Sequence, residues 1–199
     1  MDDMSILKRE DEEFQMLLEV AEEYTKQRSE KTPEKKSGNA TEIVIRNHLL
    51  KRKFNVTLNP NVKIDGSNIK NDMLLLKSNI NSNKLMYAPN EVNMVIEIKN
   101  NAVANQSRII RRNFNELQGI SEKFRFAVIV LSERRGYTHE ITEEKLENKK
   151  YRVFTLITRE KYPKGGLYRK ENIVKMLHGN EMTKTRKWEE FIAYLKKNY

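Results

Sequence analysis

The hydrophobic positions of this chain follow a helical period in four segments. Apolar residues recur every three or four positions along residues 8–28, 39–53 and 107–120, and again near the C-terminus. The C-terminal stripe consists of Trp188, Phe191, Ile192 and Leu195. This spacing places apolar side chains on one side of a helix, so we predict four amphipathic helices, with Asn39 as the N-cap of the second.

Other apolar runs are short and predict β-strands. They cover residues 54–58, 71–77, 93–99, 126–131 and 151–158. The fourth run is continuously apolar and rich in β-branched side chains, as in a strand that is covered on both faces. After the N-terminal helix, the predicted order is helix, three strands, helix, two strands and helix. This order is typical of an α/β domain in which helices pack on a mixed sheet.

A polar linker separates the first helix from the rest of the chain. Residues 31–38 include Pro33, Ser37 and Gly38 among charged residues and contain no apolar side chain. A chain of 199 residues has room for one domain of ordinary size and an appendage. We therefore predict an acidic N-terminal helix and linker over residues 1–37, and a single domain over residues 38–199.

Composition argues against several classes of protein. The chain contains no cysteine, which excludes disulfide frameworks, thiolate zinc sites and cysteine nucleophiles. No apolar run approaches the roughly 18 residues that a membrane span needs, and the N-terminus is acidic rather than basic and then apolar. We expect neither a membrane protein nor a secreted precursor, but an intracellular, cytoplasmic protein.

The charge of the chain is unevenly distributed. The formal net charge is +10, yet residues 1–24 hold nine acidic side chains against Lys8 and Arg9. The remainder is therefore more basic than the total indicates. A body this basic favours a polyanionic partner, most commonly nucleic acid, although lysine-rich solvated surfaces also occur in many proteins that bind none.

Residues 93–99 carry two charged side chains inside an apolar sequence. Side chains alternate along a strand, so Glu97 and Lys99 share one face while the neighbouring isoleucines occupy the other. Burying an acid and a lysine is costly unless they are paired or bound to something. Asp72 stands at the start of another apolar strand, where a metal ion could be reached from solvent.

The helix over residues 39–53 adds a third carboxylate, Glu42. At about 100° per residue, Glu42 falls within the apolar stripe of this helix and not on its wet face. We expect that stripe to rest on the sheet, close to Asp72 and Glu97. The alternative interpretation is a capping box, in which Glu42 pairs with the N-cap Asn39.

This combination of an inward Glu on a helix, an Asp, and Glu-x-Lys on the following strand resembles the PD-(D/E)XK nuclease superfamily. The segment over residues 87–100 is also similar to the lead-in to the Glu-x-Lys strand in uncharacterised prokaryotic members. The resemblance covers residues 38–158. It implies an α/β fold with a restriction endonuclease-like core, a central mixed β-sheet flanked by helices, and here an extra N-terminal helix.

The resemblance also implies catalytic roles. Asp72 and Glu97 match the metal ligands, Lys99 matches the catalytic lysine, and Glu42 matches the acidic residue that many members place on the first helix. Asp72, Glu97 and the backbone carbonyl of Ile98 would hold Mg²⁺ or Mn²⁺, with Glu42 as a ligand of a second ion or of a metal-bound water. Hard oxygen ligands suit these ions. Whether one ion or two is used stays open.

Two departures from the superfamily pattern concern the first acid. Asn71 stands where many members have proline, and 24 residues separate Asp72 from Glu97. This long spacing leaves Asp65 as a rival for the first acidic position. We prefer Asp72, because an apolar strand follows it directly, whereas the sequence after Asp65 is typical of a turn.

The chemistry of these residues agrees with phosphodiester hydrolysis. That reaction requires charge stabilisation on the phosphoryl oxygens and an activated water, and a divalent ion supplies both. Lys99 could orient the water, help its deprotonation or stabilise developing negative charge, and the sequence leaves these roles open.

A polar stripe lies opposite the apolar side of the predicted helix over residues 107–120. Its members are Arg108, Arg111, Arg112 and Asn115, at spacings of three and four. The stripe could grip nucleic-acid phosphates, or it could be an ordinary solvated helix face. Gln106 stands where some exonuclease-like relatives carry a glutamine after Glu-x-Lys.

We therefore predict an Mg²⁺-dependent (or Mn²⁺-dependent) endodeoxyribonuclease that acts in restriction, defence, repair or mobile-element processing, in a prokaryote, phage or mobile element. DNA is the expected partner, with RNA as an alternative. By analogy, cutting both strands would call for a homodimer. The alternatives are a ribonuclease on the same fold and a non-catalytic nucleic-acid-binding module.

Overall fold

The computed structural model describes residues 12–29, 37–101, 104–134, 150–159, 182–184 and 187–199. Its elements are α2 (Glu12–Ser29), α3 (Ser37–Lys51), β1 (Lys63–Ile64), β2 (Met73–Leu76), β3 (Met86–Tyr87), the 3₁₀ turn η1 (Pro89–Glu91), β4 (Val92–Asn101), α4 (Ala104–Ile120), β5 (Arg125–Arg134), β6 (Tyr151–Arg159), β7 (Met182–Lys184) and α6 (Lys187–Asn198).

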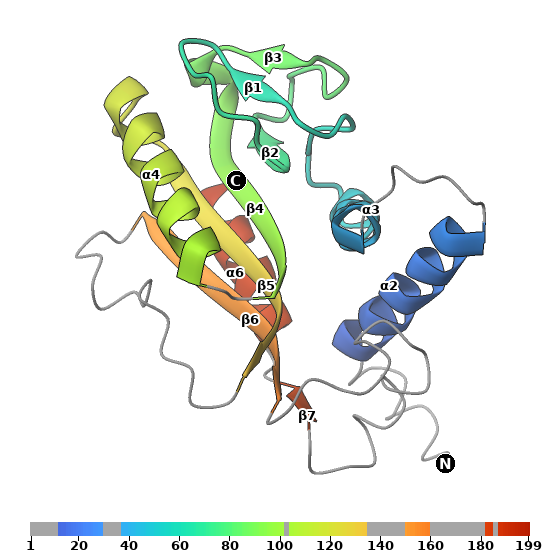
Figure 1. Cartoon of the computed structure of the whole chain (residues 1–199). Coiled ribbons are helices and arrows are strands. Elements are labelled where there is room, and N and C mark those ends of the chain that lie inside the picture. The colour runs from blue at the N-terminus through green and yellow to red at the C-terminus, as the bar shows by residue number, and fades with distance from the viewer. Residues whose placement is uncertain (1–11, 30–36, 102–103, 135–149, 160–181, 185–186) are drawn as a thin grey trace.

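A five-stranded sheet in the order β2-β4-β5-β6-β7 forms the centre of the fold. Strands β4, β5 and β6 run parallel to one another, whereas β2 and β7 lie antiparallel at the two edges. Helices pack on both faces of this sheet (Figure 1). The predicted fold class, a central mixed sheet flanked by helices, is thereby confirmed.

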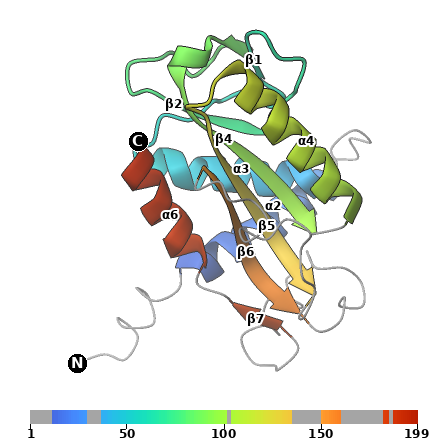
Figure 2. The same ribbon diagram turned by 90° about the vertical axis from the view of Figure 1, so that its left-hand side faces the viewer.

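The two faces of the sheet bury different helices, because side chains alternate along each strand. On β4, Ile96 and Ile98 belong to the core that includes residues of α2, α3 and α6. Val95 faces the other way, into the core that α4 covers with Ile110 and Phe114. Figures 1 and 2 show α4 on the opposite side of the sheet from α3. Charged residues that alternate with the β4 isoleucines therefore lie on the α4 face.

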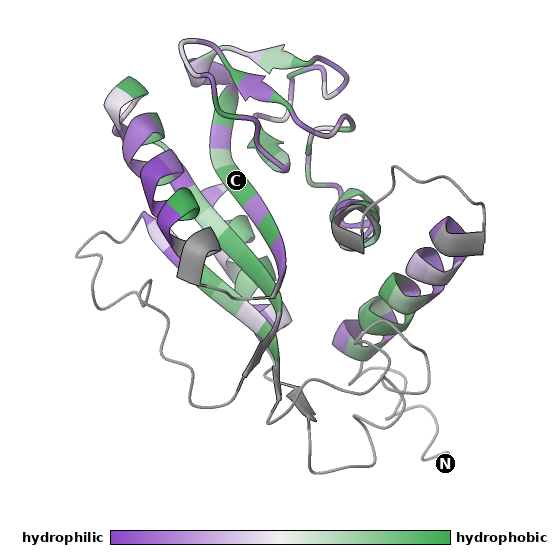
Figure 3. Cartoon of the chain, viewed as in Figure 1, coloured by the Kyte–Doolittle hydropathy of each residue, from purple (hydrophilic) through white to green (hydrophobic). Residues whose placement is uncertain are grey.

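Hydropathy follows this layering. The central strands are largely apolar, and the polar positions of α4 lie along its outer side (Figure 3). No helix in the described part of the chain is long and apolar enough to cross a membrane.

The N-terminal helix packs into the same core as the sheet. Four apolar side chains of α2 are at most 2% exposed and contact the core that α3 and α6 share: Met16, Leu17, Val20 and Ala21. The described part of this helix begins at Glu12, so the first residues of the segment predicted from residue 8, and most of the predicted linker, lie outside the described residues.

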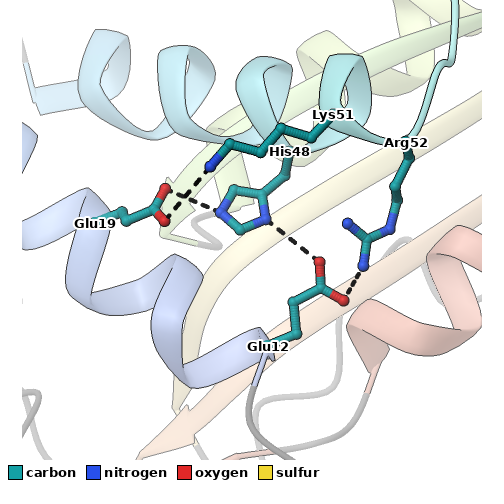
Figure 4. Close-up of polar contacts among 5 residues, drawn as sticks. All are labelled: Glu12, Glu19, His48, Lys51 and Arg52. Atoms are coloured by element: carbon teal, nitrogen blue, oxygen red, sulfur yellow. Dashed lines mark hydrogen bonds and ion pairs between the residues drawn. The ribbon is translucent and has the colours of Figure 1, made fainter. Parts of the chain in front are cut away.

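Acidic residues of α2 also fasten this helix to α3 (Figure 4). His48 is buried, and its Nε2 and Nδ1 atoms lie 3.0 Å and 3.4 Å from carboxylate oxygens of Glu19 and Glu12. Glu12 also pairs with Arg52, and Glu19 lies 3.9 Å from the Lys51 ammonium. Part of the acidic charge of the N-terminal segment therefore serves to dock one helix on the next.

Three local predictions were wrong or incomplete. Helix α3 begins at Ser37, so Asn39 lies in its first turn and is not the N-cap. Residues 54–58 run beside β2, with backbone hydrogen bonds from the Thr57 N–H to the Leu74 carbonyl and from the Leu76 N–H to the Asn55 carbonyl, but make only an isolated bridge at Val56. The short strands β1, β3 and β7 were not predicted, because two or three residues carry no readable period.

Candidate active site

The candidate site lies where the edge strand β2 stops and its neighbour β4 continues. The antiparallel pairing ends with Met73 opposite Ile96. Just beyond this pair, the Asp72 carboxylate takes the place of a backbone acceptor on β2. Its Oδ2 atom accepts a hydrogen bond of 2.8 Å from the Ile98 N–H. The N–H and C=O groups of one strand residue point to the same side, so the Ile98 carbonyl faces this same open edge.

Glu97 and Lys99 extend from β4 toward the Asp72 carboxylate. The Lys99 Nζ atom donates hydrogen bonds of 2.8 Å to Glu97 Oε2 and 2.9 Å to Asp72 Oδ2. Both carboxylates therefore contact one ammonium group, although Glu97 lies on β4 and Asp72 directly before β2. The Lys99 and Asp72 side chains are each about one-fifth exposed, whereas Glu97 is 4% exposed. Solvent can thus reach the cluster at Asp72 and Lys99, which form its rim, but not at Glu97, which forms its base.

The Glu97 carboxylate is buried, and only one of its two oxygen atoms has a hydrogen-bond partner. Its Oε2 atom contacts Lys99, but its Oε1 atom is buried without any hydrogen-bond partner. Burial and the neighbouring Asp72 carboxylate raise the pKa of Glu97 to about 8, and Lys99 offsets only part of this effect. In return, although burial alone would lower it, the two carboxylates raise the pKa of Lys99 above its usual value. Lys99 therefore does not fully neutralise the two carboxylates, and additional positive charge would stabilise them.

Helix α3 brings a third carboxylate toward this edge. Burial and the Asp72 charge raise the pKa of Glu42 to about 7, while Arg46 and Lys99 act in the opposite direction. Glu42 therefore lies within electrostatic reach of the cluster, as its place in the apolar stripe predicted. Because Asn39 is not the N-cap, the capping-box interpretation of Glu42 does not apply.

Arg46, one turn after Glu42, is a site residue that the sequence analysis missed. Its side chain is buried, its Nη2 atom lies 3.5 Å from the backbone carbonyl oxygen of Asp72, and its Nε atom has no hydrogen-bond partner. The sequence does indicate this position, because a residue four positions after Glu42 falls in the same apolar stripe of the helix. A buried cation beside the acids reduces their mutual repulsion.

Asp65, the rival for the first acid, lies elsewhere. It is exposed, and its Oδ1 atom accepts a hydrogen bond from the N–H of Gly66 in its own turn. Gly66 has φ of +82°, a conformation that favours glycine. Asp65 thus has the turn role that its sequence context indicates, and Asp72 is the acid that contacts the β4 cluster.

The donor atoms at this edge fit a small, hard cation. The Asp72 and Glu97 carboxylates both contact the Lys99 ammonium, and the Ile98 carbonyl faces the same strand edge. The buried Glu97 Oε1 atom has no hydrogen-bond partner, and a bound cation would supply one. Mg²⁺ in proteins is bound by one or two carboxylates together with water and substrate phosphate. No group of three acidic or histidine side chains in the described ranges forms a ready metal centre. The fit therefore rests on Asp72, Glu97 and Ile98, with Glu42 nearby.

The predicted polar stripe lies on the outer side of α4. Arg108, Arg111, Arg112 and Asn115 are all exposed, whereas Ile110, Phe114 and Leu117 on the opposite side are buried. Because α4 covers the face of the sheet that carries Glu97 and Lys99, the stripe belongs to the same side of the molecule as the cluster. The side chain of Gln106 lies outside the described residues.

Comparison with known proteins shows a similarity to a solved structure. No protein-family model matches the chain, and no curated protein matches it. The chain is similar to NucC of P. aeruginosa ATCC27853 in its cAAA-bound form, with a TM-score of 0.49 and 12% sequence identity, over 93% of this chain and 91% of NucC. A match at this level assigns neither a family nor an activity, so the functional interpretation rests on the site itself.

Proposed function

We propose that this protein is a divalent-metal-dependent endodeoxyribonuclease of the PD-(D/E)XK superfamily. The observation that supports this most strongly is the meeting of the Asp72 and Glu97 carboxylates on the Lys99 ammonium at an open strand edge. These residues match the two acids and the lysine of the superfamily motif, and 24 residues separate Asp72 from Glu97. A protein that only binds nucleic acid gains nothing from carboxylates that face phosphate.

Asp72, Glu97 and the Ile98 carbonyl would hold Mg²⁺ or Mn²⁺, with Glu42 able to act on a second ion or on a water molecule. When bound, the ion would neutralise charge on the scissile phosphate and make an attacking water more acidic. Asp72 is held in place for this role by its bond from the Ile98 N–H. Glu97 is held by burial, and its unpartnered Oε1 atom is free to accept a ligand.

Lys99 would act on the water or on the phosphate. Its ammonium group carries three donors on a flexible stem, so it can orient the attacking water, help remove its proton or stabilise charge that develops on the phosphoryl oxygens. Each role requires the ammonium group to reach the scissile phosphate or the attacking water at this strand edge, and its present contacts with Asp72 and Glu97 support that reach.

DNA is the substrate that the charge distribution favours. The chain has a net charge of +10, and the exposed arginines of α4 lie on the same side of the sheet as the acidic cluster. Arginine side chains on a helix are suited to contact phosphates, which fix the position of a duplex without reading its sequence. Cutting both strands would call for two such sites, hence a homodimer.

Purified protein should convert supercoiled plasmid DNA into nicked and linear forms with Mg²⁺ or Mn²⁺ and should do nothing in EDTA. The same protein, incubated with single-stranded RNA of matched length, should leave the RNA intact. Gel electrophoresis of both reactions over a range of protein concentrations measures the two activities side by side.

Two other outcomes would replace this proposal. Cutting of RNA with intact plasmid would make the protein a ribonuclease. Salt-sensitive DNA binding without cutting at any metal concentration would make it a non-catalytic binding module.

A further inference from the structure

The Lys99 ammonium occupies the position between the two acidic side chains. Its hydrogen bonds to Asp72 Oδ2 and Glu97 Oε2 use one oxygen of each carboxylate. A divalent ion held by both acids would need oxygens of these same two groups. Two cations cannot share that position, because at contact distance their repulsion is large even in a partly solvated site.

We infer that Lys99 is an internal counter-cation that holds the two carboxylates together in the metal-free protein and leaves its position when a divalent ion binds. This inference rests on the proposed function, since it assumes that the acidic cluster takes a metal ion. It adds a role for Lys99 that precedes any chemistry on the substrate.

The surroundings allow this exchange. The Lys99 side chain is 21% exposed and ends a flexible stem, so its ammonium can move toward solvent without disturbing the strand. Glu97, at 4% exposed, is too deeply buried to follow it. Arg46 is also buried and stays beside Asp72 as a fixed positive charge. One cation of the site is thus mobile and the other is anchored.

The exchange explains why one oxygen atom of Glu97 has a partner in the metal-free protein and the other has none. Lys99 reaches only Oε2 and leaves Oε1 buried without a partner. An ion with several coordination positions could contact a second donor where an ammonium on a tether cannot. The displaced lysine would remain at the rim, beside the place where a scissile phosphate has to lie.

Metal binding to variants at Lys99 tests this inference without any DNA. Free Mn²⁺ can be measured by electron paramagnetic resonance while protein is titrated with Mn²⁺. Lys99→Met, which keeps the length of the side chain and removes its charge, should bind Mn²⁺ at least about tenfold more tightly than wild type. Lys99→Arg keeps the charge and pairs well with carboxylates, so it should bind no more tightly than wild type. Lys123→Met removes a charge from an exposed loop position and serves as the matched control.

Thermal unfolding gives a second measure of the same exchange. Without its counter-cation, metal-free Lys99→Met should melt at a lower temperature than wild type, because only Arg46 then offsets the repulsion between Asp72 and Glu97. Saturating Mn²⁺ should raise the melting temperature more in this variant than in wild type, since tighter binding stabilises the folded state further.

The wild-type protein offers a test that does not depend on a variant folding. In ¹H–¹⁵N spectra of lysine side chains, the Lys99 ammonium should give a signal protected from solvent exchange in metal-free protein. Saturation with Mg²⁺ should shift or remove that signal.

The outcomes separate this inference from the proposed function. Equal or weaker Mn²⁺ binding by Lys99→Met, or a Lys99 signal that Mg²⁺ leaves unchanged, would overturn the exchange even if the wild type cuts DNA. Wild-type protein that binds no Mn²⁺ at all would overturn both the exchange and the metal-dependent nuclease.

Discussion

Replacing Asp72 with asparagine should abolish DNA cleavage, with a loss of at least about 100-fold in rate. The amide keeps the size of the carboxylate, and its oxygen can still accept the hydrogen bond from the Ile98 N–H. What it removes is the negative charge that would hold a divalent ion and that now pairs with Lys99. Cleavage of plasmid DNA with Mg²⁺, followed as a time course at equal protein concentration, measures the loss.

Asp65 provides the matched control for this substitution. It is also an aspartate on the segment that leads to β4, but it is exposed and its carboxylate bonds within a turn. Asp65→Asn should cut at the wild-type rate. If instead Asp65→Asn were inactive and Asp72→Asn active, the first acid of the motif would be Asp65 and the site would have to be rebuilt around it.

Replacing Arg108 and Arg112 with glutamine should lower DNA affinity by roughly 50-fold at 0.1 M salt. Each phosphate contact contributes about 0.9 to the slope of log affinity against log salt, so two lost contacts should reduce that slope by about 2. Both side chains are exposed on α4, four residues apart, and neither contributes to the core. Fluorescence anisotropy with a labelled duplex in Ca²⁺, measured at several salt concentrations, gives both the affinity and the slope.

Two lysines of the C-terminal helix control for the loss of charge alone. Lys196 and Lys197 are exposed in the last turn of α6, which packs on the opposite face of the sheet from α4. Their replacement by glutamine should leave the salt slope near its wild-type value. An equal reduction of the salt slope in both double variants would mean that DNA affinity depends on the total charge of the protein and that α4 is an ordinary solvated helix.

The residues of the candidate site were predictable where local periodicity decides their position. The alternation of side chains along residues 93–99 places Glu97 and Lys99 on one face, and they do share it. What alternation cannot give is the register between strands. With 24 residues between Asp72 and Glu97, the sequence does not specify that Met73 stands opposite Ile96, which is the pairing that brings Asp72 to the cluster.

The place of Arg46 in the site was not predicted, for a different reason. The helical period that placed Glu42 against the sheet places Arg46 there as well, but a basic residue in an apolar stripe is usually read as a surface residue whose stem is buried. Its contact with the Asp72 backbone depends on how α3 crosses the edge of the sheet, which only the folded chain defines.

The fold was predictable from its longer elements and not from its shorter ones. The continuous apolar run over residues 126–131 predicted a strand that is covered on both faces, and β5 lies between β4 and β6 with helices on each side. Strands β1 and β3 have two residues each, and their pairing depends on the turns around them. Residues 54–58 alternate as a strand does, yet only Val56 forms a bridge.

A crystal structure of the protein with Mn²⁺ and a short DNA duplex tests the central claim most directly, because anomalous scattering locates Mn²⁺ without reference to the protein chain. We predict an anomalous peak about 2.1 Å from oxygens of both Asp72 and Glu97 and from the Ile98 carbonyl, with a DNA phosphate completing the coordination. A peak that contacts only one of the two carboxylates, or that lies away from the end of β2, would contradict the account.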